Sequence, residues 1–278
     1  MKKWIAMMMS VLLCTLLCAC GATTNNDTDV LDDALTGTVA TDGSTSMEKV
    51  IGYLSEAFSE RNSGVEVSYN PTGSSAGIQA VKSGSCDIGL ASRDLKADES
   101  ETLTGTVVAI DGIAIIVHPQ NTVSDLSVEQ IRALYTGEIK NWSELGGANA
   151  PVVLIGREAG SGTRDGFESI TDTKDKCQYS QELTSTGDVV TTVAGNPNAV
   201  GYASLASVKD SVKAVTVEGV APTTETIQSG AYKIQRNFLL VTRTGEPLSR
   251  QAQAFFEFAT SPEADTLIEQ AGAVPIKR

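Results

Sequence analysis

The residues best suited to chemistry lie in one glycine-rich stretch at positions 156–164. Arg157 carries a planar guanidinium that fits a tetrahedral oxyanion through two parallel hydrogen bonds, and Ser161 and Thr163 add hydroxyl donors. The glycines around them let the backbone approach a ligand closely. The stretch therefore indicates an anion site. An ordinary capped helix beside a surface arginine is the alternative that the stretch alone leaves open.

The flanking sequence indicates how this stretch is positioned. An apolar, β-branched run at 152–155 is typical of a buried strand, and Phe167 and Ile170 are spaced as on one helical face. In such a strand–turn–helix unit the first backbone N–H groups of the helix are unpaired, and the positive end of its dipole favours an anion. Four predicted helix starts combine Ser or Thr with Gly in this way, at 43–46, 73–77, 160–163 and 185–187.

The order of the predicted elements favours an α/β fold with largely parallel sheets, because strands alternate with helices from residue 37 onward. Parallel sheets bind ligands beyond the carboxyl ends of their strands, where the next helices begin. Four polar helix starts with Arg157 and Arg93 nearby therefore predict a dehydrated oxyanion site. No Gly-Lys-Ser/Thr run is present, which argues against a nucleotide P-loop.

Apolar periodicity places the individual elements. Strands are predicted at 37–40, 65–69, 86–91, 106–110, 112–117, 152–155, 199–203, 212–217 and 232–241. Helices are predicted to start near 45, 74, 127, 162, 186, 248 and 261. Thr45 with Glu48, and Ser127 with Gln130, have the spacing of a capping box, so the Thr45 hydroxyl could cap a helix as well as bind an anion at the same helix end.

Composition limits the partners. The 278 residues, 41% of them hydrophobic, suffice for two modest domains or one large one. The formal net charge is −13, and removal of a leader that contains Lys2 and Lys3 would bring it near −15. Such acidity argues against nucleic acid or an acidic membrane surface as partner. A small anion stays compatible with it, because donors at close range in a desolvated cleft outweigh a screened global field.

The histidine content argues against metal and general-base chemistry. His118 is the single histidine, so a His-rich metal site is excluded and no metal or cofactor is expected. Residues 73–77 match the Gly-x-Ser-x-Gly nucleophile elbow, which makes a serine hydrolase with Ser75 an alternative. His118 lies too close to Ser75 in the chain for the usual intervening acid, so we expect a binding protein rather than an enzyme.

The N-terminal residues are typical of an export signal. Residues 1–19 have a basic start, a short apolar core and small residues at the end, and residues 20–36 include a Thr-, Asn- and Asp-rich run expected to form a flexible tether. The sequence Leu-Cys-Ala-Cys at 17–20 resembles a bacterial lipoprotein box. That resemblance implies cleavage before Cys20, lipid (palmitate included) on that cysteine, and anchoring to the outer face of the cell membrane. A retained membrane anchor is the alternative, disfavoured because the apolar run is short.

Cys86 and Cys177 are the cysteines left in the mature chain. Export permits a disulfide, but two distant cysteines do not require one. Because their segments are expected in different lobes, we predict that both are unpaired.

From about residue 37 to the end, the chain resembles the phosphate-binding proteins of bacterial phosphate ABC transporters. The resemblance rests on Arg157 with Gly-Ser-Gly-Thr-Arg at 160–164 and on Thr-Gly-Ser-Ser-Ala-Gly at 72–77, with support from 135–142 and 198–202. It implies a two-lobed periplasmic-binding-protein-like fold of type II. Each lobe is then a mostly parallel sheet flanked by helices, and crossing strands form the hinge. The implied boundaries are 37–112 plus 232–278 for lobe I and 113–231 for lobe II.

The same resemblance implies function and site. A monomer of this kind captures inorganic phosphate between its lobes and delivers it to the permease subunits of the transporter. The phosphate ligands that it implies are Ser44 and Thr45 at the first helix start, Ser74 and Ser75 at the second, and Arg157, Ser161, Gly162 and Thr163 at the third.

One position departs from the family pattern. Many members carry an aspartate after the third strand, which accepts the proton of hydrogen phosphate and helps to reject sulfate. Ser92 stands at the matching position here and is expected as a ligand, while Arg93 either binds the anion or pairs with Asp94 at the rim. Another tetrahedral oxyanion, such as sulfate or molybdate, is therefore the alternative ligand.

Overall fold

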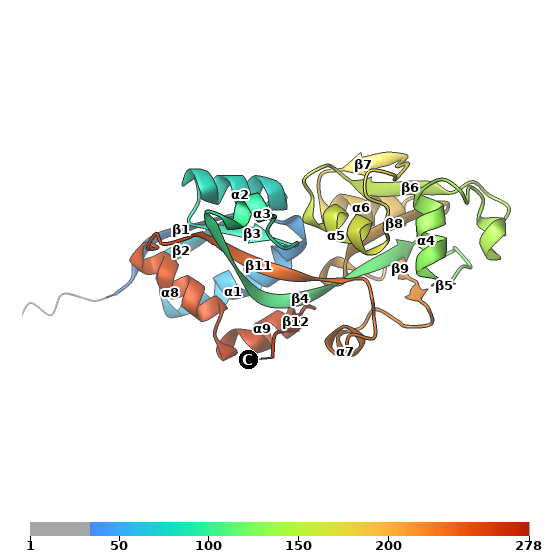
Figure 1. Ribbon diagram of the computed structural model, residues 1–278. Helices are drawn as coiled ribbons and strands as arrows, with labels where there is room; N and C mark the ends of the chain where they lie inside the picture. Colours follow the sequence, from blue (N-terminus) through green and yellow to red (C-terminus); the bar gives the residue numbers. More distant parts are fainter. Residues whose placement is uncertain (1–33, 278) are drawn as a thin grey trace, which may run out of the picture. The chain divides into compact units, whose positions relative to one another are not determined.

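A mixed sheet organises residues 34–277, the part of the chain that the computed structural model describes (Figure 1). Its strands are β1 (Thr36–Gly43), β2 (Gly64–Asn70), β3 (Ile88–Ala91), β4 (Leu103–Val117), β6 (Val153–Arg157), β7 (Gln181–Leu183), β8 (Ala199–Ser204), β9 (Lys213–Ala214), β11 (Gln235–Arg243) and β12 (Val274–Pro275). The hydrogen-bonded order is β2-β1-β3-β11-β4-β8-β6-β7, and β9 and β12 pair with β4. A separate pair joins β5 (Asp125–Leu126) and β10 (Thr216–Val217).

Helices cover both faces of this sheet. The α-helices are α1 (Glu48–Arg61), α2 (Ser74–Ser83), α3 (Ala97–Ser100), α4 (Val128–Tyr135), α5 (Gly162–Ile170), α6 (Thr186–Ala194), α7 (Thr224–Gln228), α8 (Arg250–Ala259) and α9 (Asp265–Gln270). Short 3-10 helices are η1 (Thr45–Met47), η2 (Trp142–Leu145), η3 (Leu205–Ser207) and η4 (Pro262–Ala264). The predicted alternation of strands and helices is confirmed.

The leader lies outside the described residues. The residues outside the described part include the predicted signal peptide at 1–19, Cys20 and most of the predicted tether at 20–36. Strand β1 begins at Thr36, the last residue of that predicted tether. Within 34–277, no helix is both long enough and apolar enough to cross a bilayer.

The strand directions divide the sheet into two parts. β1 pairs in parallel with β2 and β3, and β6 pairs in parallel with β7 and β8. Between these groups, β11 and β4 are antiparallel to their neighbours and run from one group to the other (Figure 1). We call the elements around β1–β3, with α1–α3, α8 and α9, the first half, and those around β6–β8, with α4–α6, the second half.

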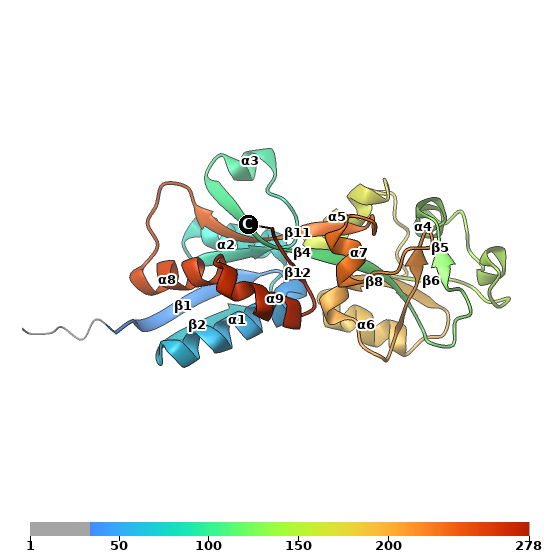
Figure 2. The ribbon, with the colours of Figure 1, turned by 90° about the horizontal axis from the view of Figure 1, so that it is seen from below.

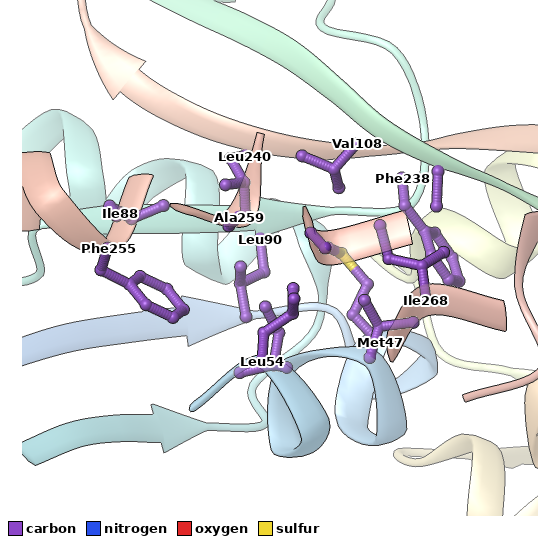
Figure 3. Packing of buried hydrophobic residues seen from close by; sticks show 14 of the residues in the cluster. Met47, Leu54, Ile88, Leu90, Val108, Phe238, Leu240, Phe255, Ala259 and Ile268 are labelled. Carbon is purple, nitrogen blue, oxygen red and sulfur yellow. The ribbon is translucent and has the colours of Figure 1, made fainter. Parts of the chain in front are cut away.

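The core of the first half follows the two-residue period of its strands. On β11, Phe238 and Leu240 pack with α1, α8 and α9, whereas Leu239 packs with α2 on the opposite face. Figure 3 shows Phe238 and Leu240 in one cluster with Leu54 of α1 and Phe255 of α8. Viewed from below, α1, α8 and α9 lie on the near side (Figure 2). The C-terminal helices therefore pack against the N-terminal strands.

Strand β4 carries the core from the first half into the second. Along it, Ile113 and Ile115 pack toward α4 and α5, while Ala114 and Ile116 pack toward α6. The prediction of two separate strands at 106–110 and 112–117 is wrong, because β4 is one continuous strand.

A buried ion pair explains why the polar position in β4 does not end the strand. Asp111 is fully buried opposite Arg236 of β11, with 2.9 Å between Arg236 Nη2 and Asp111 Oδ2. Ser204 of β8 donates to the other carboxylate oxygen at 2.7 Å. Burial raises the pKa of Asp111, and the adjacent guanidinium opposes that rise. The pair thus joins the two crossing strands next to the point where β4 begins to pair with β8.

Three other predictions about local structure differ in outcome. The capping box at Ser127 is confirmed, since Gln130 N donates to Ser127 Oγ at 3.1 Å and Ser127 N donates to Gln130 Oε1 at 2.9 Å. The capping box at Thr45 with Glu48 is wrong. Ser44 occupies the cap of η1 without a side-chain bond, and the Thr45 hydroxyl contacts a distant residue instead. The strand predicted at 212–217 is divided into β9 and β10.

Two glycines test the packing of the first half. A Cβ on Gly77 in α2 would lie 2.3 Å from Asp42 O and 2.5 Å from Gly43 Cα, whereas a Cβ on Gly52 in α1 would have no atom within 4 Å. Gly77→Ala should therefore lower the free energy of unfolding by about 1–3 kcal/mol. Gly52→Ala should raise it by up to about 1 kcal/mol, because alanine favours a helix. Urea denaturation measures both, and a Gly77→Ala protein as stable as the wild type would contradict this packing.

Candidate anion-binding site

The polar helix starts meet beyond the carboxyl ends of the parallel strands, as expected for a ligand site in such a sheet. Ser44 follows β1 and Ser92 follows β3, and Ser44 N donates to Leu90 O at 2.9 Å. Gly43 makes this approach possible, because its φ is +139° and a Cβ there would lie 2.2 Å from Leu90 O. The close approach of Gly43 to Leu90 therefore brings the hydroxyls of Ser44 and Ser92 together.

Three serines of the first half form a hydrogen-bonded group. Ser44 Oγ donates to Ser92 Oγ at 2.8 Å, and Ser92 N donates to Ser74 Oγ at 3.0 Å. The hydroxyls of Ser74 and Ser92 are 3.1 Å apart. All three side chains are at most 2% exposed. Ser92 thus lies at the centre of the group.

A second group of hydroxyls joins the two halves. Ser46 Oγ is 2.8 Å from Thr163 Oγ1 and 3.1 Å from Thr186 Oγ1. Thr45 Oγ1 is 3.1 Å from Thr186 Oγ1 and accepts from Thr186 N at 3.3 Å. These four side chains are 1–4% exposed. We call this group together with the three serines of the first half the hydroxyl cluster.

Sequence reasoning missed Ser46 and Thr186 as site residues. Both lie in the polar helix starts that the sequence analysis marked, at 43–46 and 185–187. The family motifs covered only the first three starts, so the fourth was left without named ligands. The Ser-Thr-Gly composition of residues 185–187 was the signal that could have identified Thr186.

Arg157 ends β6 and is 2% exposed. Its Nη1 donates to Thr186 Oγ1 at 3.1 Å, so one donor is directed into the hydroxyl cluster. Its Nε and Nη2 donate to Glu158 at 3.0 and 2.8 Å, and the same atoms donate to the carbonyls of Leu183 and Thr184. The guanidinium is therefore held rigidly and its charge is balanced by one carboxylate.

A buried tyrosine network fixes the backbone of Arg157. Arg157 N donates to the hydroxyl of Tyr202 at 3.2 Å, which lies 3.0 Å from the hydroxyl of Tyr179. Tyr179 donates to Glu168 Oε1 at 2.9 Å, and the ring of Tyr202 stacks on Phe167 with centroids 4.1 Å apart. Burial raises the pKa of Tyr202, so its hydroxyl stays neutral.

The start of α5 abuts the serines of the first half. A Cβ on Gly162 would lie 2.3 Å from Ser74 Oγ and 2.6 Å from Ser92 Oγ. Ser161 caps this helix by accepting from Arg164 N at 3.4 Å, and its side chain is 1% exposed. Only glycine allows this contact between a helix start and two hydroxyls.

Arg93 and Ser75 lie beside the hydroxyl cluster rather than within it. Arg93 Nη2 donates to Ser75 Oγ at 3.2 Å. Of the two alternatives for Arg93, pairing with the Asp94 carboxylate is wrong: Arg93 donates to the main-chain oxygen of Asp94, and its carboxylate partners are Glu99 and Asp165. The Asp94 carboxylate accepts from Asn237 instead.

The elements of a serine hydrolase do not come together among the described residues. Ser75 Oγ accepts from Arg93, while His118 Nδ1 accepts from Gln120 N at 3.1 Å after the far end of β4. No hydrogen bond joins Ser75 and His118. Within 34–277 there is also no group of three His, Cys, Asp or Glu side chains able to hold a metal ion.

The two cysteines of the described chain lie in different cores. Cys86 packs with Ile78 of α2, and Cys177 packs beside Tyr135 of α4. Both thiols are free. Burial raises the pKa of Cys86 to about 11, so this thiol stays protonated at neutral pH.

Comparison with known proteins agrees with this geometry. A family model described as a PBP superfamily domain matches residues 30–263. A Clostridium perfringens protein, described as a phosphate ABC transporter substrate-binding protein and crystallised with bound phosphate, is 40% identical, with a TM-score of 0.83 over 87% of this chain and 100% of that chain. An ABC-type phosphate transport receptor from Vibrio cholerae is 33% identical, with a TM-score of 0.72 over 86% of this chain and 100% of its own. The phosphate-binding protein PstS of Bacillus subtilis (strain 168) is 27% identical over 99% of this chain and 94% of that protein.

The fold is therefore that of a substrate-binding protein of the PBP superfamily. Within that superfamily, the chain belongs to the family of phosphate-binding proteins of phosphate ABC transporters. The predicted α/β, periplasmic-binding-protein-like fold is confirmed.

The tyrosine network predicts a specific loss of stability. Tyr202→Phe removes the acceptor of a buried N–H group of Arg157, which should lower the free energy of unfolding by about 1–3 kcal/mol. Tyr53→Phe is the control, because Tyr53 is 41% exposed and its hydroxyl can be hydrated in the folded and the unfolded protein. It should change stability by less than about 0.5 kcal/mol. If denaturant titration gave the two variants equal stability, the role assigned to the Tyr202 hydroxyl would be wrong.

Proposed function

We propose that this protein captures inorganic phosphate between its two halves and delivers it to an ABC permease for import. The observation that carries the proposal is the hydroxyl cluster, in which buried hydroxyls from both halves contact one another and Thr186 accepts from Arg157. The Clostridium perfringens relative with bound phosphate supports the choice of ligand. Capture is binding without a chemical step, in keeping with relatives that are transport proteins.

The direct ligands that we propose share two properties: they are buried, and they belong to the cluster or to the start of α5. They are Ser44, Thr45, Ser46, Ser74, Ser92, Arg157, Ser161, Gly162, Thr163 and Thr186. When phosphate binds, the hydrogen bonds between these hydroxyls would be replaced by hydrogen bonds that the hydroxyls donate to phosphate oxygens. Ser75 and Arg93 have other partners and are proposed to line the edge of the site.

The charge arrangement suits reversible binding. Glu158 already balances the charge of Arg157, so the phosphate charge would be compensated by hydroxyl donors and by the N-terminal N–H groups of α5 and α6. Such dipoles bind an anion at short range without a net positive field. Tight but releasable binding is what delivery to a permease requires.

Burial of the site implies that the protein must open. Groups that are 0–4% exposed cannot admit a ligand from solution while the two halves are in contact. We propose residues 37–112 with 232–278 as lobe I, residues 113–231 as lobe II, and the crossing strands β4 and β11 as the hinge between them. The monomer then closes over one phosphate.

Ser92 by itself does not distinguish a protonated oxyanion from a fully ionised one. At neutral pH phosphate carries at least one proton, and a serine oxygen can accept a hydrogen bond from it. The same hydroxyl can donate to a fully ionised oxyanion. Sulfate or molybdate therefore stays as the alternative ligand, to be decided by titration.

Location is part of the proposal as well. The basic start, the short apolar run and Cys20 support export and a lipid anchor on the outer face of the cell membrane. The tether that follows would leave the protein free to dock on the permease.

Calorimetric titration of the purified protein tests the ligand. We expect phosphate to bind and sulfate to bind far more weakly, at two pH values on either side of the second ionisation of phosphate. The melting temperature should rise with phosphate concentration, because only the folded form binds. Equal binding of sulfate, or binding of neither anion, would contradict the assignment.

Removal of the Arg157 guanidinium tests the site. Arg157→Ala should weaken phosphate binding at least about 30-fold, because one partner of a buried charged hydrogen bond is lost. Arg61→Ala is the control. It removes the same charge from an exposed ion pair at the C-terminal end of α1, whereas the candidate site lies before the N-terminal end of that helix. That variant should bind phosphate like the wild type. Unchanged affinity of Arg157→Ala would show that the ligand lies elsewhere.

A further inference from the structure

An ion-pair network beside the hydroxyl cluster joins the two halves. Arg93 directly follows Ser92 at the end of β3 and is 6% exposed. Its Nη1 and Nη2 donate to the two carboxylate oxygens of Glu99 in α3, at 2.7 and 2.8 Å. Glu99 also accepts from Lys96 N at 2.8 Å, and these bonds hold its pKa below its usual range. Arg93 is therefore anchored in the first half.

The third guanidinium nitrogen, Nε, makes no hydrogen bond and lies close to a carboxylate of the other half, with which it forms an ion pair. Arg93 Nε lies 3.0 Å from Asp165 Oδ2. Asp165 belongs to the first turn of α5, where the helix dipole favours a carboxylate, and its side chain is 34% exposed. The carboxylate thus projects from the helix whose first residue, Gly162, abuts Ser74 and Ser92.

This geometry makes the contact dependent on closure. Opening of the site moves α5 away from Ser74 and Ser92, and Asp165 moves with its helix. Glu99 stays with Arg93, because both belong to the first half. Opening therefore separates the ion pair of Arg93 with Asp165 and leaves the hydrogen bonds from Arg93 to Glu99 intact.

We propose that the ion pair of Arg93 with Asp165 is a closing contact that sets the affinity of this protein without touching its ligand. The inference rests on the proposed capture of phosphate. A contact made only in the closed form adds its free energy to the apparent affinity, since the ligand also binds the closed form better. It lowers the rate at which the closed form opens and thereby the rate of ligand release.

The sign of the effect separates this role from simple electrostatics. Asp165 is a negative charge close to a site for an anion, so its long-range field opposes phosphate binding. If that field were its main effect, neutralising Asp165 would strengthen binding. A closing contact predicts the opposite result. Since the carboxylate is partly exposed, the expected effect is modest.

The decisive variant is Asp165→Asn, which keeps the shape of the side chain and removes its charge. We expect the Kd for inorganic phosphate to rise about 3- to 10-fold, through faster dissociation, in calorimetry and stopped-flow measurements on the purified protein. The melting temperature without phosphate should stay unchanged, and only the rise caused by phosphate should shrink. Glu263→Gln is the matched control, because it removes a carboxylate from the exposed pair with Arg61 inside the first half. Its Kd should equal that of the wild type.

Further outcomes separate the two proposals. If wild-type protein failed to bind phosphate, the proposed function would be wrong. If it bound phosphate and Asp165→Asn bound equally well or more tightly, the closing contact would be wrong. An equal fall in melting temperature with and without phosphate would also overturn it, since that indicates a purely structural role. Asp165→Glu keeps the charge and should recover part of the lost affinity.

Discussion

Buried hydroxyl groups need hydrogen-bond partners, and this requirement determines how the two halves meet. A hydroxyl removed from water without a partner costs on the order of 1–3 kcal/mol, and seven of them lie together at the edge of this sheet. In the closed protein each is satisfied by a hydroxyl or by a backbone group. Hydroxyls can serve as donor or acceptor, so the cluster can change partners when an oxyanion arrives. Carboxylates or lysines at these positions could not do so.

Pairing of charges explains how an acidic protein can hold an anion. Each buried arginine near the site has a carboxylate partner: Arg157 has Glu158, Arg93 has Glu99, and Arg236 has Asp111. The local field is therefore set by oriented dipoles rather than by net charge, and the formal charge of −13 on the chain has little weight at such short range. The pair of Arg236 with Asp111 adds a constraint of its own, because removing one partner would leave an unpaired charge buried in the crossing strands.

Local patterns in the sequence were enough to predict features that are contiguous in the chain. Arg157, Ser161 and Thr163 belong to one strand–turn–helix unit, and the paired capping residues of α4 lie three positions apart. Contacts across the fold could not be read in this way. Thr45 resembled a helix cap, but its partner Thr186 lies in the other half, and a tertiary contact replaced the local one.

The same limit applies to charges and to strand ends. A polar residue and a glycine at 111–112 resembled a break between two strands, because the partner of Asp111 lies more than a hundred residues further along. Asp94 was the nearest acid to Arg93 in sequence, but the end of β3 directs the guanidinium toward Glu99 and Asp165. Sequence spacing indicates which residues share an element, whereas the pairing of elements decides which side chains meet.

A crystal structure of the protein grown with phosphate would test the central claim most directly. The account predicts one tetrahedral anion between the halves, within hydrogen-bond distance of Arg157 Nη1, of Thr186 and of serine hydroxyls from the first half. The hydroxyl-to-hydroxyl bonds of the cluster should be replaced by bonds to that anion. A phosphate bound elsewhere, with the cluster unchanged, would contradict the account.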